Sequence, residues 1–148
     1  MKTMICTTEQ ETESLGRWLI RALPVPSFVA LYGDLGAGKT ALVRGMGAEA
    51  GTSEVRSPTF TIVHEYETQP KLIHFDAYRL DSAEELFAIG FDDYLAQDAV
   101  IVLEWAERVL EALPKERLEL RLIGSGDDPR EIHLTAYGER YESVVDAL

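Results

Sequence analysis

This chain of 148 residues contains the stretch GDLGAGKT, residues Gly33–Thr40, which limits its possible folds more than any other feature of the sequence. It matches G-x-x-x-x-G-K-[ST], a loop in which glycines let backbone N–H groups approach a phosphate. The apolar run SFVALY precedes it, and TALVRGMGAEA, which reads as a helix, follows it. A strand, a loop and a helix in this order bring the positive end of the helix dipole to the anion. The sequence therefore predicts a P-loop that binds a nucleotide.

The side chains at the end of this loop indicate its chemistry. Lys39 is expected to reach the β- and γ-phosphates, and the Thr40 hydroxyl is expected to bind Mg²⁺. The residues predicted to bind the nucleotide here are Gly33, Asp34, Leu35, Gly36, Ala37, Gly38, Lys39 and Thr40.

The first half of the chain shows alternating helix and strand signals. Thr8 and Glu11 form a capping box ahead of an amphipathic helix that is expected to end near Ala22. TIVHEYE and KLIHFDAYRL, joined by TQP, are predicted to pair as antiparallel strands. Ser82 and Glu85 are expected to form a second capping box, and Gly90 to stop that helix.

The second half completes an α/β pattern. AVIVLEW is almost wholly apolar, which is typical of a central strand covered on both faces, and AERVLEALP reads as a helix. RLELRLIG and EIHLTAYG alternate like two half-exposed strands before a short terminal helix. The fold predicted is a P-loop NTPase-like three-layer α/β sandwich around a mixed β-sheet, parallel at its centre.

The composition of the chain limits the binding partners and the cellular compartment that are expected for it. The chain is 46% hydrophobic, enough for one core, so residues 1–148 are predicted to form a single domain. A net charge of −12 suits it poorly to binding a nucleic-acid backbone directly. Neither a membrane span nor a signal peptide is evident, and the single cysteine, Cys6, fits a reducing cytoplasm. A cytoplasmic location is expected.

Two strand-end carboxylates are candidates for metal binding and for orienting a water nucleophile. Glu104 closes VIVLE and Asp76 closes LIHFD, so both should emerge where sites form in α/β sheets. Thr59, in the loop RSPTF, is placed to sense a γ-phosphate. Trp105 is interpreted as a core residue. The histidines are interpreted as structural or surface residues without metal-ligand spacing; they are His64, His74 and His133.

Four motifs in a fixed order make the pattern specific. GDLGAGKT, SPTFTIVHEY, HFDAYRL and LEWAERV together closely resemble the bacterial TsaE (YjeE) family, from about Thr8 to the strand around Arg130. The resemblance implies a small P-loop ATPase required for threonylcarbamoyladenosine (t6A) modification of tRNA. It implies ATP and Mg²⁺ as ligands, with Thr40 and Glu104 at the metal.

The resemblance also implies further residue roles and partners. Asp76 and Thr59, with Lys39 and Glu104, fall on positions with catalytic or switch roles. The positions implied to line the nucleotide are Thr12 or its neighbours, Glu107 and Arg130. The family acts with the TsaD and TsaB proteins, which carry the transferase chemistry. The resemblance implies that ATP hydrolysis resets that complex, and the net charge of −12 agrees with an indirect encounter with tRNA through protein surfaces.

Other readings of the P-loop stay open from the residues alone. A small-molecule kinase usually needs an acceptor pocket and an arginine-bearing lid, and no Arg-rich insertion is present. A GTPase would carry an N-K-x-D motif that recognises guanine, and this chain has none. A non-catalytic, nucleotide-gated binding module would keep the loop without hydrolysis. Arg44, Arg56 and Arg79 are all available to stabilise a transferring phosphate in cis.

Overall fold

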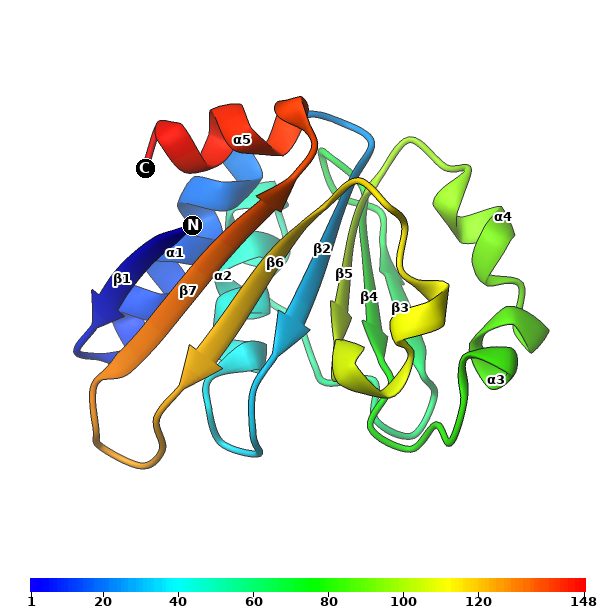
Figure 1. Cartoon of the computed structure of the whole chain (residues 1–148), viewed down its shortest axis with the longest axis horizontal. Helices are drawn as coiled ribbons and strands as arrows, with labels where there is room; N and C mark the ends of the chain where they lie inside the picture. The colour runs from blue at the N-terminus through cyan, green and yellow to red at the C-terminus, as the bar shows by residue number, and fades with distance from the viewer.

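A seven-stranded sheet in the order β1-β7-β6-β2-β5-β4-β3 forms the middle of the molecule (Figure 1), in a computed structural model that describes residues 1–148. The strands are β1 (Lys2–Cys6), β2 (Ser27–Tyr32), β3 (Val63–Tyr66), β4 (Leu72–Asp76), β5 (Val100–Glu104), β6 (Arg117–Ile123) and β7 (Arg130–Tyr137). Strands β6, β2, β5 and β4 run parallel, whereas β1, β7 and β3 pair antiparallel with their neighbours. The predicted mixed sheet with a parallel centre is confirmed.

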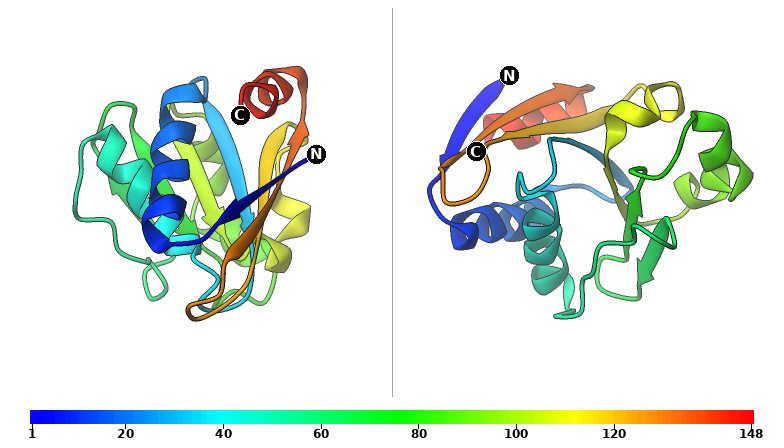
Figure 2. Two further views of the ribbon diagram at one scale, coloured as in Figure 1. Left: turned by 90° about the vertical axis from the view of Figure 1, so that its left-hand side faces the viewer. Right: turned by 90° about the horizontal axis from the view of Figure 1, so that it is seen from below.

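Helices cover both faces of this sheet. They are α1 (Glu9–Ala22), α2 (Lys39–Ala50), α3 (Ala83–Ala88), α4 (Phe91–Leu95) and α5 (Glu139–Asp146). Leucines and valines of α1, α2 and α5 share one buried cluster with one face of the sheet, and α3 and α4 contribute to a second cluster on the other face. Figure 2 shows α1 and α2 packed together, with α3 and α4 away from them. The predicted three-layer sandwich is confirmed.

Helices α1 and α2 approach so closely that two glycines are required between them. A Cβ on Gly16 would lie 2.1 Å from the carbonyl oxygen of Leu42, and one on Gly45 would lie 1.9 Å from that of Glu13. Real Cβ atoms do not come this near to backbone, so each helix packs directly on the backbone of the other. The P-loop helix is thereby held firmly against α1.

Local differences from the sequence predictions have physical reasons. AERVLEALP forms two short 3₁₀ turns, η1 (Ala106–Arg108) and η2 (Leu110–Ala112), instead of the predicted helix. Trp105 has a φ of 60° and Val109 a φ of −137°, so the backbone leaves the helical region on both sides of η1. Ser82 caps α3 without a side-chain hydrogen bond, while Glu85 accepts from the Asp81 N–H at 2.7 Å. Neither reciprocal bond of a capping box on Ser82 is therefore present, because Glu85 reaches back one residue further, to Asp81.

The carboxyl ends of the parallel strands define the edge that carries the candidate site. In Figure 1 the arrowheads of β2, β4, β5 and β6 point toward the same lower edge, where the loop before α2 and the loop between β6 and β7 also lie. Glu104 and Asp76 end β5 and β4 and are register partners, as their strand positions predict. No helix is long and apolar enough to cross a membrane.

Candidate nucleotide site

A cavity of about 660 Å³ lies at this edge and gathers residues from distant parts of the chain. Its walls come from the P-loop, the start of α1, the loop before β3, the ends of β4 and β5, and the β6–β7 loop. Among the predicted residues that line it are Thr12, Leu35, Gly36, Ala37, Gly38, Lys39, Thr40, Thr59, Asp76, Glu104 and Arg130. The predicted carboxylates and the predicted P-loop therefore share one cavity.

The P-loop presents backbone donors that have no acceptor within the protein. The N–H groups of Gly36, Gly38, Lys39 and Thr40 donate to no backbone or side-chain oxygen. Gly38 immediately precedes α2 and has a φ of 100°. Residues other than glycine rarely adopt this backbone conformation. These unpaired donors and the positive end of the α2 dipole point to an anion such as a phosphate.

Lys39 is a buried cation held by the loop itself. Its Nζ donates to the carbonyl oxygens of Gly33 and, at 2.9 Å, of Asp34, and it lies 4.2 Å from the centroid of the Trp105 ring. Burial lowers the pKa of Lys39 below its ordinary value, while nearby carboxylates, chiefly Glu104, oppose that shift. Burial therefore outweighs these carboxylates, and a phosphate beside Lys39 would stabilise its ammonium group.

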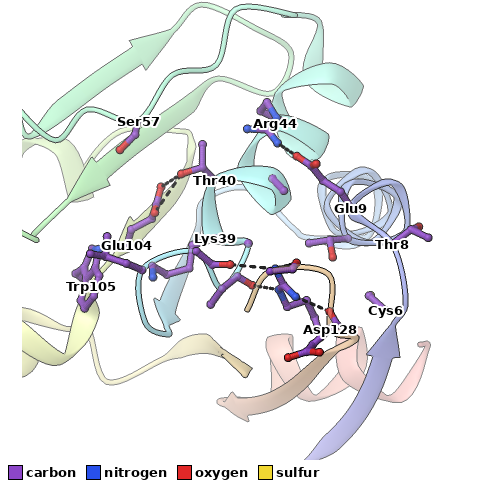
Figure 3. Close-up of a pocket in the computed structure, with 18 of the residues that line it drawn as sticks. Cys6, Thr8, Glu9, Lys39, Thr40, Arg44, Ser57, Glu104, Trp105 and Asp128 are labelled. Atoms are coloured by element: carbon purple, nitrogen blue, oxygen red, sulfur yellow. Dashed lines mark hydrogen bonds and ion pairs between the residues drawn. The ribbon is translucent and has the colours of Figure 1, made fainter. Parts of the chain in front are cut away.

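Thr40 and Glu104 face each other at the base of the cavity (Figure 3), and their spacing suits a metal. The Thr40 Oγ1 lies 3.5 and 3.4 Å from the two carboxylate oxygens, which is too long for a strong O–H···O bond. Neighbouring oxygen ligands of octahedral Mg²⁺, with bonds of about 2.1 Å, lie about 3 Å apart. The two side chains would therefore need to approach only slightly to share Mg²⁺. Glu104 is only 3% exposed, and His74 is the one basic side chain bonded to it.

Asp76 anchors the loop that carries Thr59. Its Oδ2 accepts from Ser57 Oγ at 3.0 Å and from Thr59 Oγ1 at 3.1 Å, and its Oδ1 accepts from the Tyr78 N–H at 2.8 Å. Ile62, which closes this loop, has a φ of 72°, a strained conformation for a β-branched residue. A loop that is strained and fixed through one carboxylate is suited to exchange that anchor for another anion.

Arg130 fastens the P-loop to the loop between β6 and β7. Its guanidinium donates to the carbonyl oxygens of Ala37 and Gly36, each at 3.0 Å, and to those of Gly126 and Asp128 on its own side. Both groups of acceptors border the cavity. Arg130 therefore lies at the cavity, as predicted, but its hydrogen bonds go to the protein backbone.

The wall opposite Glu104 begins at the end of β1. Cys6, Thr8, Glu9 and Thr12 line it, and Arg44 of α2 closes one side through ion pairs with Glu9 and with Glu13, the latter at 3.4 Å. Burial raises the pKa of the Cys6 thiol above its ordinary value, opposed by a hydrogen bond with Thr12. Burial therefore favours the neutral thiol of Cys6 over the thiolate, which is the reactive form of cysteine.

Some predicted residues lie elsewhere, and several site residues were not predicted. Gly33 and Asp34 do not line the cavity but hold Lys39 through their carbonyl oxygens, and Glu107 is exposed outside it. Trp105, predicted as core, lines the cavity instead. The interpretation of His74 was incomplete, because it is 0% exposed and its Nε2 lies 2.5 Å from Oε2 of Glu104. Its position two residues before Asp76 on one strand was the available signal.

Comparison with known proteins decides the family. Residues 6–132 match the family described as "Threonylcarbamoyl adenosine biosynthesis protein TsaE". The chain belongs to the TsaE family. It is 42% identical over 142 residues to the tRNA threonylcarbamoyladenosine biosynthesis protein TsaE of Bacillus subtilis, covering 94% of this chain and 88% of that protein.

A second sequence and a solved structure agree. The TsaE protein of Haemophilus influenzae is 42% identical over 122 residues, covering 81% of this chain and 77% of that one. The crystal structure of Bacillus subtilis YdiB superimposes with a TM-score of 0.83 at 34% identity, covering 99% of this chain and 92% of the other. Every residue that lines the cavity, from Cys6 to Arg130, lies within the segment that matches the TsaE family.

Proposed function

We propose that this chain is a weak, Mg²⁺-dependent ATPase that serves t6A modification of tRNA by acting on a complex of the TsaD and TsaB proteins. The observation that carries the ATPase part is the convergence of Lys39, Thr40, Glu104 and Asp76 with unpaired P-loop N–H groups in one cavity. Membership of the TsaE family, and relatives named as t6A biosynthesis proteins, support the pathway.

In this proposal the P-loop binds and orients the triphosphate. The free N–H groups of the loop and of the first turn of α2 donate to the phosphate oxygens, and Lys39 leaves the Gly33 and Asp34 carbonyl oxygens to pair with them. Thr40 and Glu104 would hold Mg²⁺, which neutralises the charge of the β- and γ-phosphates when bound. Trp105 and the β6–β7 loop limit access of bulk water.

Asp76 is proposed to orient the attacking water, while Thr59 reports on the γ-phosphate. The two residues are hydrogen-bonded in this structure, so a carboxylate freed from Thr59 could accept a hydrogen bond from water. Thr59 and its loop would then order around the γ-phosphate and present a changed surface to partner proteins. If ATP raises the affinity of this chain for a partner protein by some factor, thermodynamic linkage requires that the partner raise the affinity for ATP by the same factor.

Phosphate release and tRNA content test the two parts separately. Purified protein with ATP and Mg²⁺ is expected to release inorganic phosphate slowly, and faster when TsaD and TsaB are added. A bacterium depleted of its own TsaE is expected to regain t6A, measured by mass spectrometry of tRNA nucleosides, when this chain is expressed. Transfer of the γ-phosphate to a metabolite instead of water would favour the kinase alternative, and absence of ATP binding would contradict the proposal.

A further inference from the structure

Three strands, β2, β4 and β5, are buried at every position. His74 of β4 is the one polar residue that lies in the middle of such a strand and not at its end. All five residues of β4 are buried, and His74 is 0% exposed. In the register between β4 and β5, His74 is opposite Val102 and Asp76 is opposite Glu104. Alternate residues of a strand share a face, so His74, Asp76 and Glu104 all lie on the face of the sheet beneath α2. The histidine does not line the cavity itself but lies behind it, in contact with Glu104.

The chemistry of the two groups decides which of them donates the hydrogen bond between His74 and Glu104. A carboxylate only accepts hydrogen bonds, so the His74 Nε2 carries the proton and donates to Oε2 at 2.5 Å. The other ring nitrogen, Nδ1, is buried and has no hydrogen-bond partner. A protonated Nδ1 would leave a buried donor unpaired, so the ring is assigned as the neutral tautomer with its hydrogen on Nε2.

This bond is the only short one that Glu104 makes through its side chain. The remaining side-chain neighbour, Thr40, lies at 3.4 and 3.5 Å. Rotation of the carboxylate is therefore controlled from Oε2 by His74, which leaves Oε1 and the Thr40 hydroxyl facing the cavity without short partners. An apolar side chain at position 74 would fill the same space without leaving Nδ1 unsatisfied, so packing alone does not account for a histidine here.

We infer that His74 is a positioning residue that fixes the Glu104 carboxylate in the orientation for binding Mg²⁺ with Thr40. This inference rests on the proposed function, in which Glu104 is a metal ligand. Side chains behind the ligands of a metal orient them, and their loss typically weakens metal binding by about 10- to 100-fold. His74 acts through Glu104 and touches neither the nucleotide nor the reacting atoms, so its effect is confined to the metal-dependent part of binding.

Two amide substitutions separate positioning from packing. His74→Gln places an N–H₂ donor where Nε2 lies, whereas His74→Asn carries the same group but places it near Nδ1, short of Glu104. Binding of a fluorescent, non-hydrolysable ATP analogue is measured as Mg²⁺ is titrated, and again with chelator present. For His74→Asn and His74→Leu the Mg²⁺ concentration for half-maximal enhancement is expected to rise by about 10-fold or more, and for His74→Gln by less than about threefold. Affinity without Mg²⁺ is expected to be unchanged in all three.

Thermal unfolding by circular dichroism establishes that each variant is folded, and if His74→Asn is not, the pair His74→Leu and His74→Gln carries the test. Adding His74→Leu to Glu104→Gln is expected to cause no further loss of Mg²⁺ enhancement, because the two residues act through one carboxylate. A further loss in the double variant, equal effects of Gln and Leu, or an equal fall in Mg²⁺-free binding would overturn the inference. Wild-type protein that binds no nucleotide would overturn the proposed function as well, whereas retained Mg²⁺ enhancement in His74→Leu would overturn this inference alone.

Discussion

Arg130 and Gly36 are separated by 94 residues in sequence, yet the Arg130 Nη2 donates to the Gly36 carbonyl oxygen at 3.0 Å. The same guanidinium also binds Ala37 through Nε at 3.0 Å. A planar fork of donors thus holds two successive carbonyl oxygens of the P-loop, and residues with unpaired N–H groups in the same loop line the cavity.

Arg130→Lys is expected to weaken ATP and ADP binding by roughly 10-fold, with and without Mg²⁺, because a single ammonium replaces a fork that orders the loop. Equilibrium titration with a fluorescent nucleotide measures this. Arg117→Lys is the control, since Arg117 also makes several hydrogen bonds but only to Glu119, Pro114 and Lys115. Equal losses in both variants would contradict a specific role for Arg130.

Lys39→Met is expected to abolish tight nucleotide binding and yet raise the midpoint of thermal unfolding at neutral pH. Burial lowers the pKa of Lys39, so its ammonium is less stable in the folded protein than in the unfolded chain. This cost applies at pH values below the folded pKa and disappears as pH rises through the unfolded value near 10.5. The stability advantage of Lys39→Met should therefore shrink toward alkaline pH. Lys71→Met, at a surface ion pair, should leave binding unchanged and give no such gain.

Glu104→Gln is expected to remove most of the enhancement of nucleotide binding by Mg²⁺ while leaving Mg²⁺-free binding largely intact. The amide keeps the shape of the side chain but loses the charge that a hard cation requires. Isothermal titration with and without chelator gives both affinities. Glu49→Gln, at the surface pair with Arg21, serves as the control. Similar losses in the presence and absence of metal would make Glu104 a structural residue.

Thr59→Ala is expected to reduce the coupling between nucleotide state and partner affinity while basal ATP binding changes little. The Thr59 hydroxyl bonds both Ser57 and Asp76, so its removal frees one side of the loop anchor. Affinity for TsaD–TsaB is compared with an ATP analogue and with ADP, for wild type and variant. If the wild-type protein binds partners equally in both nucleotide states, the switch role of Thr59 is wrong, although the ATPase proposal survives.

Gly45→Ala is expected to destabilise the fold by at least about 3 kcal/mol, lowering the unfolding midpoint by roughly 10 °C. The new Cβ would lie 1.9 Å from the backbone of Glu13, which has no room to move between packed helices. Gly47→Ala on the same helix should cost less, because its close contacts are the side-chain methyls of Val55 and Thr52, and the nearest backbone atom, the Thr52 carbonyl oxygen, is at an ordinary 3.6 Å. An ordinary helix would gain about 1 kcal/mol from either change, so a stabilised Gly45→Ala would refute the close packing.

Local rules predicted much of the fold because they depend on neighbours in sequence. The Thr8 cap, with the Glu11 N–H donating to the Thr8 hydroxyl at 3.1 Å, and the left-handed Gly90 between α3 and α4 are features of this kind. The 3₁₀ turns after Trp105 could not be found this way. AERVLEALP has helical composition, but the backbone at Trp105 is turned by its place beside Lys39 and Tyr78, which are distant in the chain.

The candidate site divides in the same manner. The P-loop, Glu104 and Asp76 are visible as residue types at strand ends, where parallel topology brings them together. Ser57, Trp105 and His74 depend on partners that only the folded chain reveals, such as Asp76, Lys39 and Glu104 respectively. Glu107, which only the family resemblance suggested, lies in the turn η1, is exposed and does not line the cavity.

The order of strands in the sheet has a consequence for synthesis on the ribosome. β2, which leads into the P-loop, lies between β5 and β6, and β1 pairs only with β7. A nascent chain that has emerged through α2 therefore carries every P-loop residue proposed to bind phosphate, but neither strand that flanks β2. Domains with such distant pairings fold late, once the closing segments are available. Under the proposed function, ATP would then meet a competent site only on finished chains, and incomplete translation products would neither consume nucleotide nor occupy a partner.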